Sequence, residues 1–329
     1  MTVTIIAEIG SVHDGSFGNA LKLIELAKNV QADVVKFQTH IAGAETLRDA
    51  PSPKYFKGEP RFEYFERTAF NTHQWKEIIK KCEECKIGFL SSPFSIEAVE
   101  LLEDIGAESY KIASGEVTNH PMLERIAETG KSVYLSSGMS NYEELDAAVS
   151  IFGKAKNLTI MQCSSIYPCP ADQVGLNLLS ELRERYRTDV GFSDHTTGPG
   201  SAIAAVALGA SVIEKHLTFS RDMYGSDASL AMEPNEFAAM VKEAKFVSEV
   251  ISAPVVKGVS YNYSNMKDVF QKSIVAAYDL PSGTSLSFEM LAFKKPGTGI
   301  SASEYEAVLG RKTSRQIMKD EMIKIDDLV

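Results

Sequence analysis

The sequence has no long apolar run. No stretch of its 329 residues reaches the roughly 20 consecutive apolar positions that a helix needs to cross a bilayer. The first residues, MTVTIIAEIGS, lack the basic segment that precedes the apolar core of a secretory signal, and their own apolar run is too short to be one. We therefore expect a cytoplasmic protein with no membrane partner.

Cysteine and basic residues are also few. The four cysteines include one C-x-x-C pair, Cys82 and Cys85, which lies inside a helical pattern without a second pair. A zinc site is therefore disfavoured, and reduced thiols are expected. The 34 lysines and arginines are outnumbered by 44 aspartates and glutamates, and the formal net charge is −10. This charge argues against nucleic acid as a partner, whereas a small anionic substrate stays open because local lysines can outweigh the global field.

Short apolar runs and amphipathic segments alternate regularly from residue 3 to about residue 250. This alternation indicates parallel strands joined by helical crossovers. Eight such units in about 250 residues match the size of a (β/α)8 TIM barrel. A doubly wound open sheet is the alternative, and it is disfavoured because no glycine-rich dinucleotide turn follows the first run. The predicted strands are 4–9, 33–38, 88–93, 109–114, 132–137, 158–163, 189–194 and 211–216.

The regular alternation stops near residue 250, which predicts a domain boundary. We assign residues 1–250 to the barrel, 251–271 to a polar and aromatic linker, and 272–329 to a compact β-rich module with one short helix. The segment 40–70 is unusually long for a connection between a strand and a helix. Long connections on the top face of a barrel tend to be lids.

Polar and charged side chains stand at the end of every predicted strand. In a barrel the carboxyl ends of all strands converge on one mouth, where catalytic groups lie. Because buried charges are costly unless they are paired or bound, this crowding indicates a functional site. The strand-end residues on which the argument rests are Glu8, Lys36, Gln38, Ser92, Lys111, Ser114, Glu116, Ser165, Tyr167, Ser193, His195, Lys215 and His216.

Three of these residues are lysines: Lys36, Lys111 and Lys215. Ammonium groups with serine hydroxyls between them suit a phosphate and a carboxylate. For any single lysine, a salt bridge to a nearby glutamate is an equally good interpretation. Three lysines at the ends of three strands together favour an anionic ligand.

Two histidines, His195 and His216, end the seventh and eighth predicted strands. These strands are neighbours in a barrel, so the two rings can approach to the distance of metal ligands. Two imidazoles plus water suit Mn²⁺ or Mg²⁺, and the alternative is a pair of hydrogen-bonded core histidines. The carboxylates of Glu8, Glu116 and Asp227 remain for acid–base chemistry or hydroxyl binding.

A series of short motifs follows in order along the chain. They are AEIGSVHDGS, VVKFQTH, FLSSPFS, YKIASGE, LSSGMS, QCSSIYPCP, GFSDHT, VALGASVIEKHLT and YGSDASLAMEP, followed in the tail by KSIVAAYDLPSGTSLSFEML and KKPGTGIS. These motifs resemble the sialic acid synthase (N-acetylneuraminate synthase) family, which also includes pseudaminic acid, legionaminic acid and spore-coat polysaccharide enzymes. The tail resembles the antifreeze-like (SAF) domain of that family. The resemblance covers nearly the whole chain, and it is specific for the family but not for the sugar.

The resemblance implies condensation of phosphoenolpyruvate with an open-chain hexose such as N-acetylmannosamine, giving a nine-carbon 2-keto-3-deoxy sugar acid and phosphate. It also implies a divalent metal on the two histidines and a domain-swapped homodimer in which the SAF domain of one chain closes the other barrel. Two rival interpretations are condensation with another aldose or a phosphosugar, and a non-catalytic barrel that binds a glycan precursor. By motif, Lys36, Lys111, Ser114, Ser165 and Ser193 would hold phosphoenolpyruvate, Glu8, Gln38, Tyr167 and Asp227 would face the sugar, and Glu116 would lie beside the reacting carbons.

Four positions depart from the pattern of that family. Val12, before His13, stands where an asparagine is frequent. Lys215 stands where an arginine is frequent, and Ser165 replaces an asparagine of some members. Lys295, in KKPGTG, stands where the usual arginine reaches the N-acyl group of the sugar across the dimer. Because lysine lacks the planar fork of arginine, we expect an acceptor other than simply N-acetylmannosamine: mannose, a phosphorylated sugar or a diacetamido-dideoxy sugar. A lysine that does the arginine's work through water is the alternative.

Overall fold

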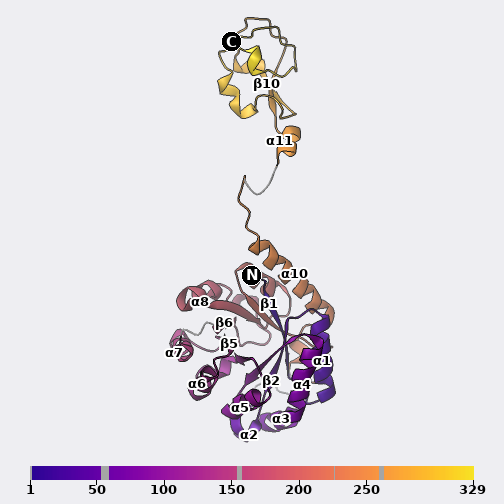
Figure 1. Cartoon of the computed structure of the whole chain (residues 1–329), viewed down its shortest axis with the longest axis vertical. Helices are drawn as coiled ribbons and strands as arrows, with labels where there is room; N and C mark the ends of the chain where they lie inside the picture. The colour runs from indigo at the N-terminus through magenta and orange to yellow at the C-terminus, as the bar shows by residue number, and fades with distance from the viewer. Residues whose placement is uncertain (1, 53–58, 154–157, 226, 259–262) are drawn as a thin grey trace. The chain divides into compact units, whose positions relative to one another are not determined.

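The chain forms two compact units, Met1–Ala253 and Pro254–Val329. The computed structural model describes residues 2–52, 59–153, 158–225, 227–258 and 263–329 (Figure 1). Each unit has its own cluster of buried hydrophobic side chains, so each buries apolar surface by itself. No helix in these ranges is long and apolar enough to cross a membrane.

The first unit is a closed barrel of eight parallel strands in sequence order, with β8 hydrogen-bonded to β1. Helices follow the strands and surround them (Figure 1). The predicted TIM barrel is therefore confirmed, and the open sheet is wrong. The strands are β1 (Thr4–Gly10), β2 (Val34–Thr39), β3 (Gly88–Pro93), β4 (Ser109–Ile112), β5 (Ser132–Ser136), β6 (Leu158–Cys163), β7 (Asp189–Asp194) and β8 (Val212–His216).

The helices outside the barrel bury one apolar face each. In α4 the buried residues Trp75, Ile78 and Cys82 are spaced three and four residues apart, which places them on one face. Burial raises the pKa of Cys82 to about 12, and all four cysteines are free thiols. The outer helices are α1 (Phe17–Asn29), α4 (Thr72–Cys85), α5 (Ile96–Asp104), α6 (His120–Glu128), α7 (Tyr142–Phe152), α8 (Leu178–Tyr186), α9 (Gly200–Ala207) and α10 (Pro234–Ser252).

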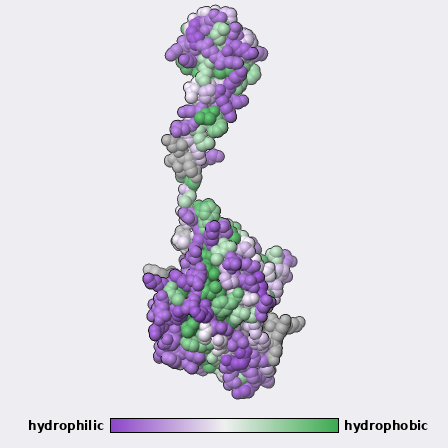
Figure 2. All heavy atoms as spheres, turned by 90° about the vertical axis from the view of Figure 1, so that its right-hand side faces the viewer, coloured by the Kyte–Doolittle hydropathy of each residue, from purple (hydrophilic) through white to green (hydrophobic). Residues whose placement is uncertain are grey.

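One outer helix leaves hydrophobic side chains in solvent. Figure 2 shows the face of the barrel that carries α10, where hydrophobic side chains interrupt a largely hydrophilic surface. On α10 the exposed ones are Phe246, Val250 and Ile251. Contiguous exposed apolar side chains mark a surface suited to another protein.

The barrel interior changes from apolar to charged along its axis. Ile6, Leu90, Met161 and Val212 form a small buried cluster inside the barrel. Because side chains alternate between the two faces of a strand, the residues two positions further along face the interior as well. On β1, β3, β6 and β8 these next residues are Glu8, Ser92, Cys163 and Glu214, and Lys36 follows two positions after Val34 of β2, which packs against the same cluster.

The long segment between β2 and β3 is not a plain loop. It contains two short helices, α2 (Ala42–Glu45) and α3 (Arg61–Thr68), while residues 53–58 lie outside the described residues. Buried aromatic residues of α3, among them Phe62 and Phe65, pack with Ala42 of α2, and the Phe65 ring stacks on that of His40. The predicted lid is therefore a packed helical wall at the carboxyl ends of β2 and β3.

The second unit is a small β-rich body, as expected. β9 (Ser273–Ala276) and β10 (Leu291–Lys294) pair antiparallel around a core that includes Ile274 and Ile317. The expected short helix is a 3-10 helix, Ala302–Ala307. The segment predicted as an irregular linker contains a further helix, α11 (Ser264–Phe270), and residues 259–262 lie outside the described residues.

A buried histidine stabilises the turn between β1 and α1. His13 is only 4% exposed, and its ring lies 4.6 Å from the Phe70 ring. The backbone N–H of Gly15 donates to His13 Nδ1 over 3.0 Å, which requires an unprotonated nitrogen there. Burial lowers the pKa of His13 from its usual 6.5 to about 4. The fold therefore needs this imidazole to be neutral.

We predict that His13 makes the barrel acid-sensitive. Between pH 6.5 and pH 4, His13 binds fewer protons in the folded state than in the unfolded state. The contribution of neutral His13 to stability is therefore complete above pH 6.5 and is lost towards pH 4. The loss from pH 7 to pH 5 should be about 2 kcal/mol. Urea unfolding at both pH values should show a smaller loss in His13→Asn, while the matched variant of exposed His73, His73→Asn, should behave as wild type. Equal losses in all three proteins would contradict this assignment.

Candidate active site

The carboxyl ends of the barrel strands enclose a cavity of about 380 Å³. Residues of several strand ends and of α3 line it, so it lies at the mouth where the sequence predicted a site. Its lining mixes polar side chains with aromatic ones, as small-molecule sites do. Six of the predicted site residues line it: Gln38, Ser114, Ser165, Tyr167, His216 and Asp227.

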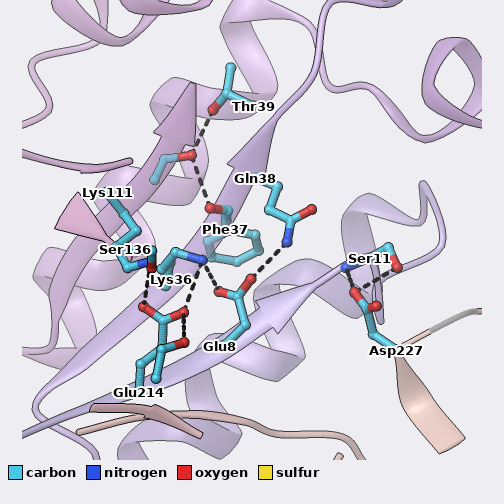
Figure 3. Close-up of polar contacts among 12 residues, drawn as sticks. Glu8, Ser11, Lys36, Phe37, Gln38, Thr39, Lys111, Ser136, Glu214 and Asp227 are labelled. Carbon is cyan, nitrogen blue, oxygen red and sulfur yellow. Dashed lines mark hydrogen bonds and ion pairs between the residues drawn. The ribbon is translucent and has the colours of Figure 1, made fainter. Parts of the chain in front are cut away.

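A network of four buried charges lies inside the barrel (Figure 3). Lys36 Nζ lies 2.8 Å from Glu8 Oε2 and 3.5 Å from Glu214 Oε1. Lys111 Nζ lies 3.6 Å from Glu214 Oε2 and donates to Ser136 Oγ over 2.5 Å. None of the four charged residues is more than 5% exposed. Glu214 thus stands between two lysines that come from β2 and β4.

The two lysines are not equally compensated. Burial disfavours the charge of Lys36, but Glu214 and Glu8 outweigh this effect and raise its pKa. For Lys111 burial prevails over the attraction of Glu214, and its pKa is lowered. Glu214 loses hydration on burial, yet Lys111 and Lys36 lower its pKa to about 2. The Lys111 ammonium is therefore the cation that gains most from an additional anion.

Serine hydroxyls surround a small space near these lysines. A Cβ atom added to Gly138 would lie 2.6 Å from both Ser114 Oγ and Ser165 Oγ, so glycine leaves this space open. Ser193 Oγ donates to Glu214 Oε1 over 3.2 Å, and Ser92 lies opposite Gln38 in the register of β3 and β2. Hydroxyl donors beside a buried ammonium suit an oxyanion.

His195 and His216 lie side by side, with ring centroids 5.8 Å apart. His195 Nδ1 bonds to the Ser164 carbonyl over 2.7 Å, which leaves Nε2 as the lone-pair nitrogen of the neutral ring. His216 Nδ1 is buried without a hydrogen-bond partner among the described residues. The Tyr167 ring lies 4.0 Å from that of His195.

This histidine pair fits a divalent metal with open positions. A backbone carbonyl that fixes the tautomer of a histidine is the usual support of a metal ligand, and the unpartnered Nδ1 of His216 lacks another explanation. No set of three histidine, cysteine or carboxylate side chains converges as a metal site within the described residues. The protein ligands would therefore be the two imidazoles, with the other positions left for water or substrate.

Hydrogen bonds fix Glu8 of this network and one further carboxylate, Asp227, at the mouth. Gln38 Nε2 donates to Glu8 Oε1 over 2.9 Å. Asp227 Oδ2 accepts from the backbone N–H of Ser11 over 2.7 Å and from its hydroxyl over 2.8 Å (Figure 3). A Cβ at Gly10 would lie 2.3 Å from Asp227 Oδ2, so glycine allows this close approach. The geometry positions hydrogen-bonding groups where a polyhydroxylated ligand would meet them.

Comparison with known proteins identifies the family. A model of the NeuB family matches residues 23–255, and a model of the SAF domain matches residues 271–329. The chain belongs to the NeuB family. It is 36% identical to N,N'-diacetyllegionaminic acid synthase of Campylobacter jejuni, over 97% of this chain and 98% of that protein. It is 31% identical to human N-acetylneuraminate-9-phosphate synthase, over 99% of this chain and 92% of that protein.

A solved structure agrees with this membership in the NeuB family. N-acetylneuraminic acid (sialic acid) synthetase from Leptospira borgpetersenii serovar Hardjo-bovis, solved in complex with citrate, matches with a TM-score of 0.70 at 30% identity. The match covers 81% of this chain and 90% of that chain. The predicted resemblance to sialic acid synthases with a SAF domain is confirmed, and the relatives are nonulosonic acid synthases.

The structure corrects one predicted substrate-binding residue of this NeuB-family chain. Lys215 is buried, but it is one position out of phase with Glu214 and His216 and so faces the outer helices. Its ammonium donates to Asp194 Oδ2 over 2.8 Å and to the carbonyl oxygens of Thr196 and Gly198. Lys215 therefore holds the loop after β7, and its proposed role at the substrate is withdrawn.

Glu116 and Lys295 belong neither to the cavity lining nor to the charged network. Glu116 follows β4 in a 3-10 turn, and its Oε2 accepts from Asn119 Nδ2 over 2.9 Å. Burial raises the pKa of Glu116. Lys295 belongs to the second unit, where its ammonium lies 5.1 Å from the centroid of the Phe270 ring. The roles proposed for both residues stay predictions.

The NeuB-family fold brings to the site three groups that were not among the predicted site residues. Glu214 lies in the charged network, and His40 and Arg61 line the cavity. The alternation of β8 carried the signal for Glu214, because positions 212, 214 and 216 share one face. No sequence pattern marked Arg61, since its place depends on how α3 packs.

We predict that removing the charge of Glu214, the central anion of the network, destabilises the folded protein. Glu214→Gln leaves two buried ammonium groups with one carboxylate, and breaking a buried ion pair in this way should cost at least about 3 kcal/mol of unfolding free energy. The matched control is Asp146→Asn, which breaks the ion pair with Arg185 on the surface and should cost less than about 1 kcal/mol. Urea unfolding of both variants measures the contrast. Similar small losses would show that water or protein groups compensate the lysines without Glu214.

Proposed function

We propose that this chain condenses phosphoenolpyruvate with an open-chain hexose to a nine-carbon 2-keto-3-deoxy sugar acid and phosphate. The single observation that carries the proposal is the buried Lys36–Glu214–Lys111 network at the mouth that also holds His195 and His216. Support comes from the relatives, which are named as synthases of legionaminic acid and of N-acetylneuraminate 9-phosphate.

The anion-binding groups would hold phosphoenolpyruvate. Lys111, whose charge the protein compensates only in part, would bind its phosphate or carboxylate, with Lys36 beside it. The hydroxyls of Ser114 and Ser165 face the space that Gly138 leaves open and would donate to the phosphate oxygens. Ser193 and Ser92 would complete this side, as the sequence predicted.

The opposite groups would hold the sugar with its aldehyde at the histidines. Gln38, Asp227 and Tyr167 line the cavity and would bind hydroxyl groups. A divalent metal on His195 and His216 would act as a Lewis acid that polarises the aldehyde. Glu8 accepts a hydrogen bond from the Gln38 amide and pairs with Lys36. It would therefore position one residue that binds the sugar and one that binds phosphoenolpyruvate.

In the proposed reaction the protein positions the two substrates and forms no covalent bond with either of them. The methylene carbon of phosphoenolpyruvate attacks the aldehyde carbon, whose oxygen takes a proton. Water adds to the enol carbon, and phosphate leaves by cleavage of the C–O bond. Lys111 and Lys36 would stabilise the departing phosphate. Glu116, whose pKa burial raises, would be the candidate to exchange a proton near these carbons.

The reduced thiols support a cytoplasmic location.

Phosphate release tests this function. The purified chain is supplied with phosphoenolpyruvate, Mn²⁺ and each of several hexoses, and both phosphate and the keto acid are measured. Sugar-dependent release is expected, and Lys111→Ala should raise the KM for phosphoenolpyruvate about tenfold with a smaller effect on the KM for the sugar. A larger effect on the sugar would contradict the role of Lys111. Release of phosphate without a keto acid would overturn the condensation.

We predict that the two histidines form the metal site. Calorimetric titration with Mn²⁺ should show binding to the wild type and none to His195→Ala or His216→Ala, because each variant removes one of only two protein ligands. His73→Asn, which changes an exposed histidine of α4, should bind as the wild type does. Undiminished binding by both alanine variants would place the metal elsewhere.

A homodimer with exchanged SAF units is also part of the proposal. Exposed hydrophobic side chains occur in both units: Phe246, Val250 and Ile251 on α10, and Val269 and Phe270 on α11. Such surfaces favour a protein partner, and a second copy of the chain offers both kinds. Lys295 of one chain would then reach the barrel mouth of the other.

Mixed dimers test this exchange. Deletion of residues 272–329 should abolish turnover and leave a folded barrel, because the barrel has a core of its own. His216→Ala damages the barrel and Lys295→Ala damages the tail, so a mixture of the two inactive chains should recover one intact site per mixed dimer. Full activity of the truncated chain, or a mixture without recovery, would argue against the exchange.

A further inference from the structure

An arginine that forms no ion pair among the described residues lines the cavity. Arg61, the first residue of α3, is half-buried, and its guanidinium lies 5.3 Å from the centroid of the Phe65 ring. Its backbone N–H donates to Ser52 Oγ over 3.0 Å. Within the described residues no ion pair involves Arg61, whereas Arg67 on the same helix pairs with Asp14 and Glu59. The Arg61 charge partly offsets the burial that raises the pKa of Glu116, but no ion pair joins these two described residues. The Arg61 side chain therefore offers its hydrogen-bond donors to the cavity that it lines.

The wall that carries Arg61 is stiffened by a stack of rings. The His40 ring lies 3.9 Å from that of Phe65 and 4.2 Å from that of Phe94, both nearly parallel to it. His40 Nδ1 bonds to Glu45 over 2.8 Å, and Nε2 bonds to Gln38 over 3.1 Å. This wall therefore has a fixed shape on the side of β2 and β3.

The Phe94 side of this wall lies across the mouth from His195. His195 follows β7 and Phe94 follows β3, and these two strands are four apart in a closed barrel of eight. Strands so related stand on opposite sides of the barrel. A hexose whose aldehyde faces His195 therefore presents its far end to Phe94, and Arg61 lines the same cavity as Phe94.

The chemistry of this wall suits an acylamido group. A guanidinium donates to a carbonyl oxygen, and the exposed methyl of an acyl group can pack on Phe94, Met139 or Leu230, which line the same cavity. A phosphate suits it less. Arg61 is the only lysine or arginine among the cavity-lining residues that the structure describes, and the carboxylate of Glu45 lies beside His40 in the same wall.

We propose that Arg61 is a specificity-determining residue that binds the carbonyl of an acylamido group at the end of the acceptor hexose remote from its aldehyde. The inference rests on the proposed function and names the class of its acceptor: a hexose with an acylamido substituent at a distant carbon, beyond any next to the aldehyde. Mannose, N-acetylmannosamine and a 6-phosphorylated hexose lack that group.

The test compares sugars and arginine variants. The sugars are 2,4-diacetamido-2,4,6-trideoxymannose, N-acetylmannosamine and N-acetylmannosamine 6-phosphate, and the readout is kcat/KM at saturating phosphoenolpyruvate. The wild type should prefer the diacetamido sugar over N-acetylmannosamine by about tenfold or more, and Arg61→Gln should remove most of that preference. The KM for phosphoenolpyruvate should not change. Arg48→Gln is the matched control, because Arg48 lies over Phe62 outside the cavity lining.

Other outcomes separate the inference from the proposed function. No preference in the wild type, equal loss for all sugars, or a larger loss for the 6-phosphate would each overturn the role of Arg61. If no sugar supports phosphate release, the proposed function fails, and calorimetric binding of the same sugars decides about Arg61. Weaker binding of the diacetamido sugar alone to Arg61→Gln would then support the inference, and unchanged or undetectable binding would overturn it.

Discussion

The burial of Lys36 and Lys111 inside a closed barrel is the constraint on which the rest of the site depends. An ammonium removed from water is costly unless anions stand close to it. Glu8 and Glu214 supply these anions, and each is held by residues that reach other parts of the mouth, Gln38 and Ser193. The compensation of Lys111 is incomplete. Under the proposed function, Lys111 is the lysine that an anionic substrate would compensate further.

The alternation of strand side chains divides the polar residues between two tasks. Lys36 and Lys215 are both buried lysines near strand ends. Lys36 faces the interior with the charged network, whereas Lys215 faces the helices and fixes the loop after β7. That loop follows His195, so the outward lysine supports the site from behind. An apolar layer beneath the charges, with Met161 and Val212, closes the floor.

The two sides of the mouth differ in origin and in chemistry. Strand ends of β7 and β8 provide the imidazoles, and these residues belong to the barrel itself. The opposite wall comes from the segment between β2 and β3, where His40, Phe65 and Arg61 stack or line the cavity. A barrel can therefore keep one reaction at the strand ends while the inserted helices select the acceptor. This division accords with relatives in the family that are named for different sugar acids.

The sequence by itself determined the eight strands, the SAF unit, the family and most strand-end residues, because periodicity and motifs are properties of neighbouring positions. It did not determine the roles of Lys215, Glu214 or Arg61. The two-residue alternation of β8 indicates that the Lys215 side chain faces the outer helices. The alternation does not indicate which residues of the loop after β7 bind its ammonium. Glu214 is the centre of the charged network because the closed barrel brings Lys36 of β2 and Lys111 of β4 to the same carboxylate. The place of Arg61 follows from the packing of α3, because contacts between distant segments decide which side chains a cavity receives.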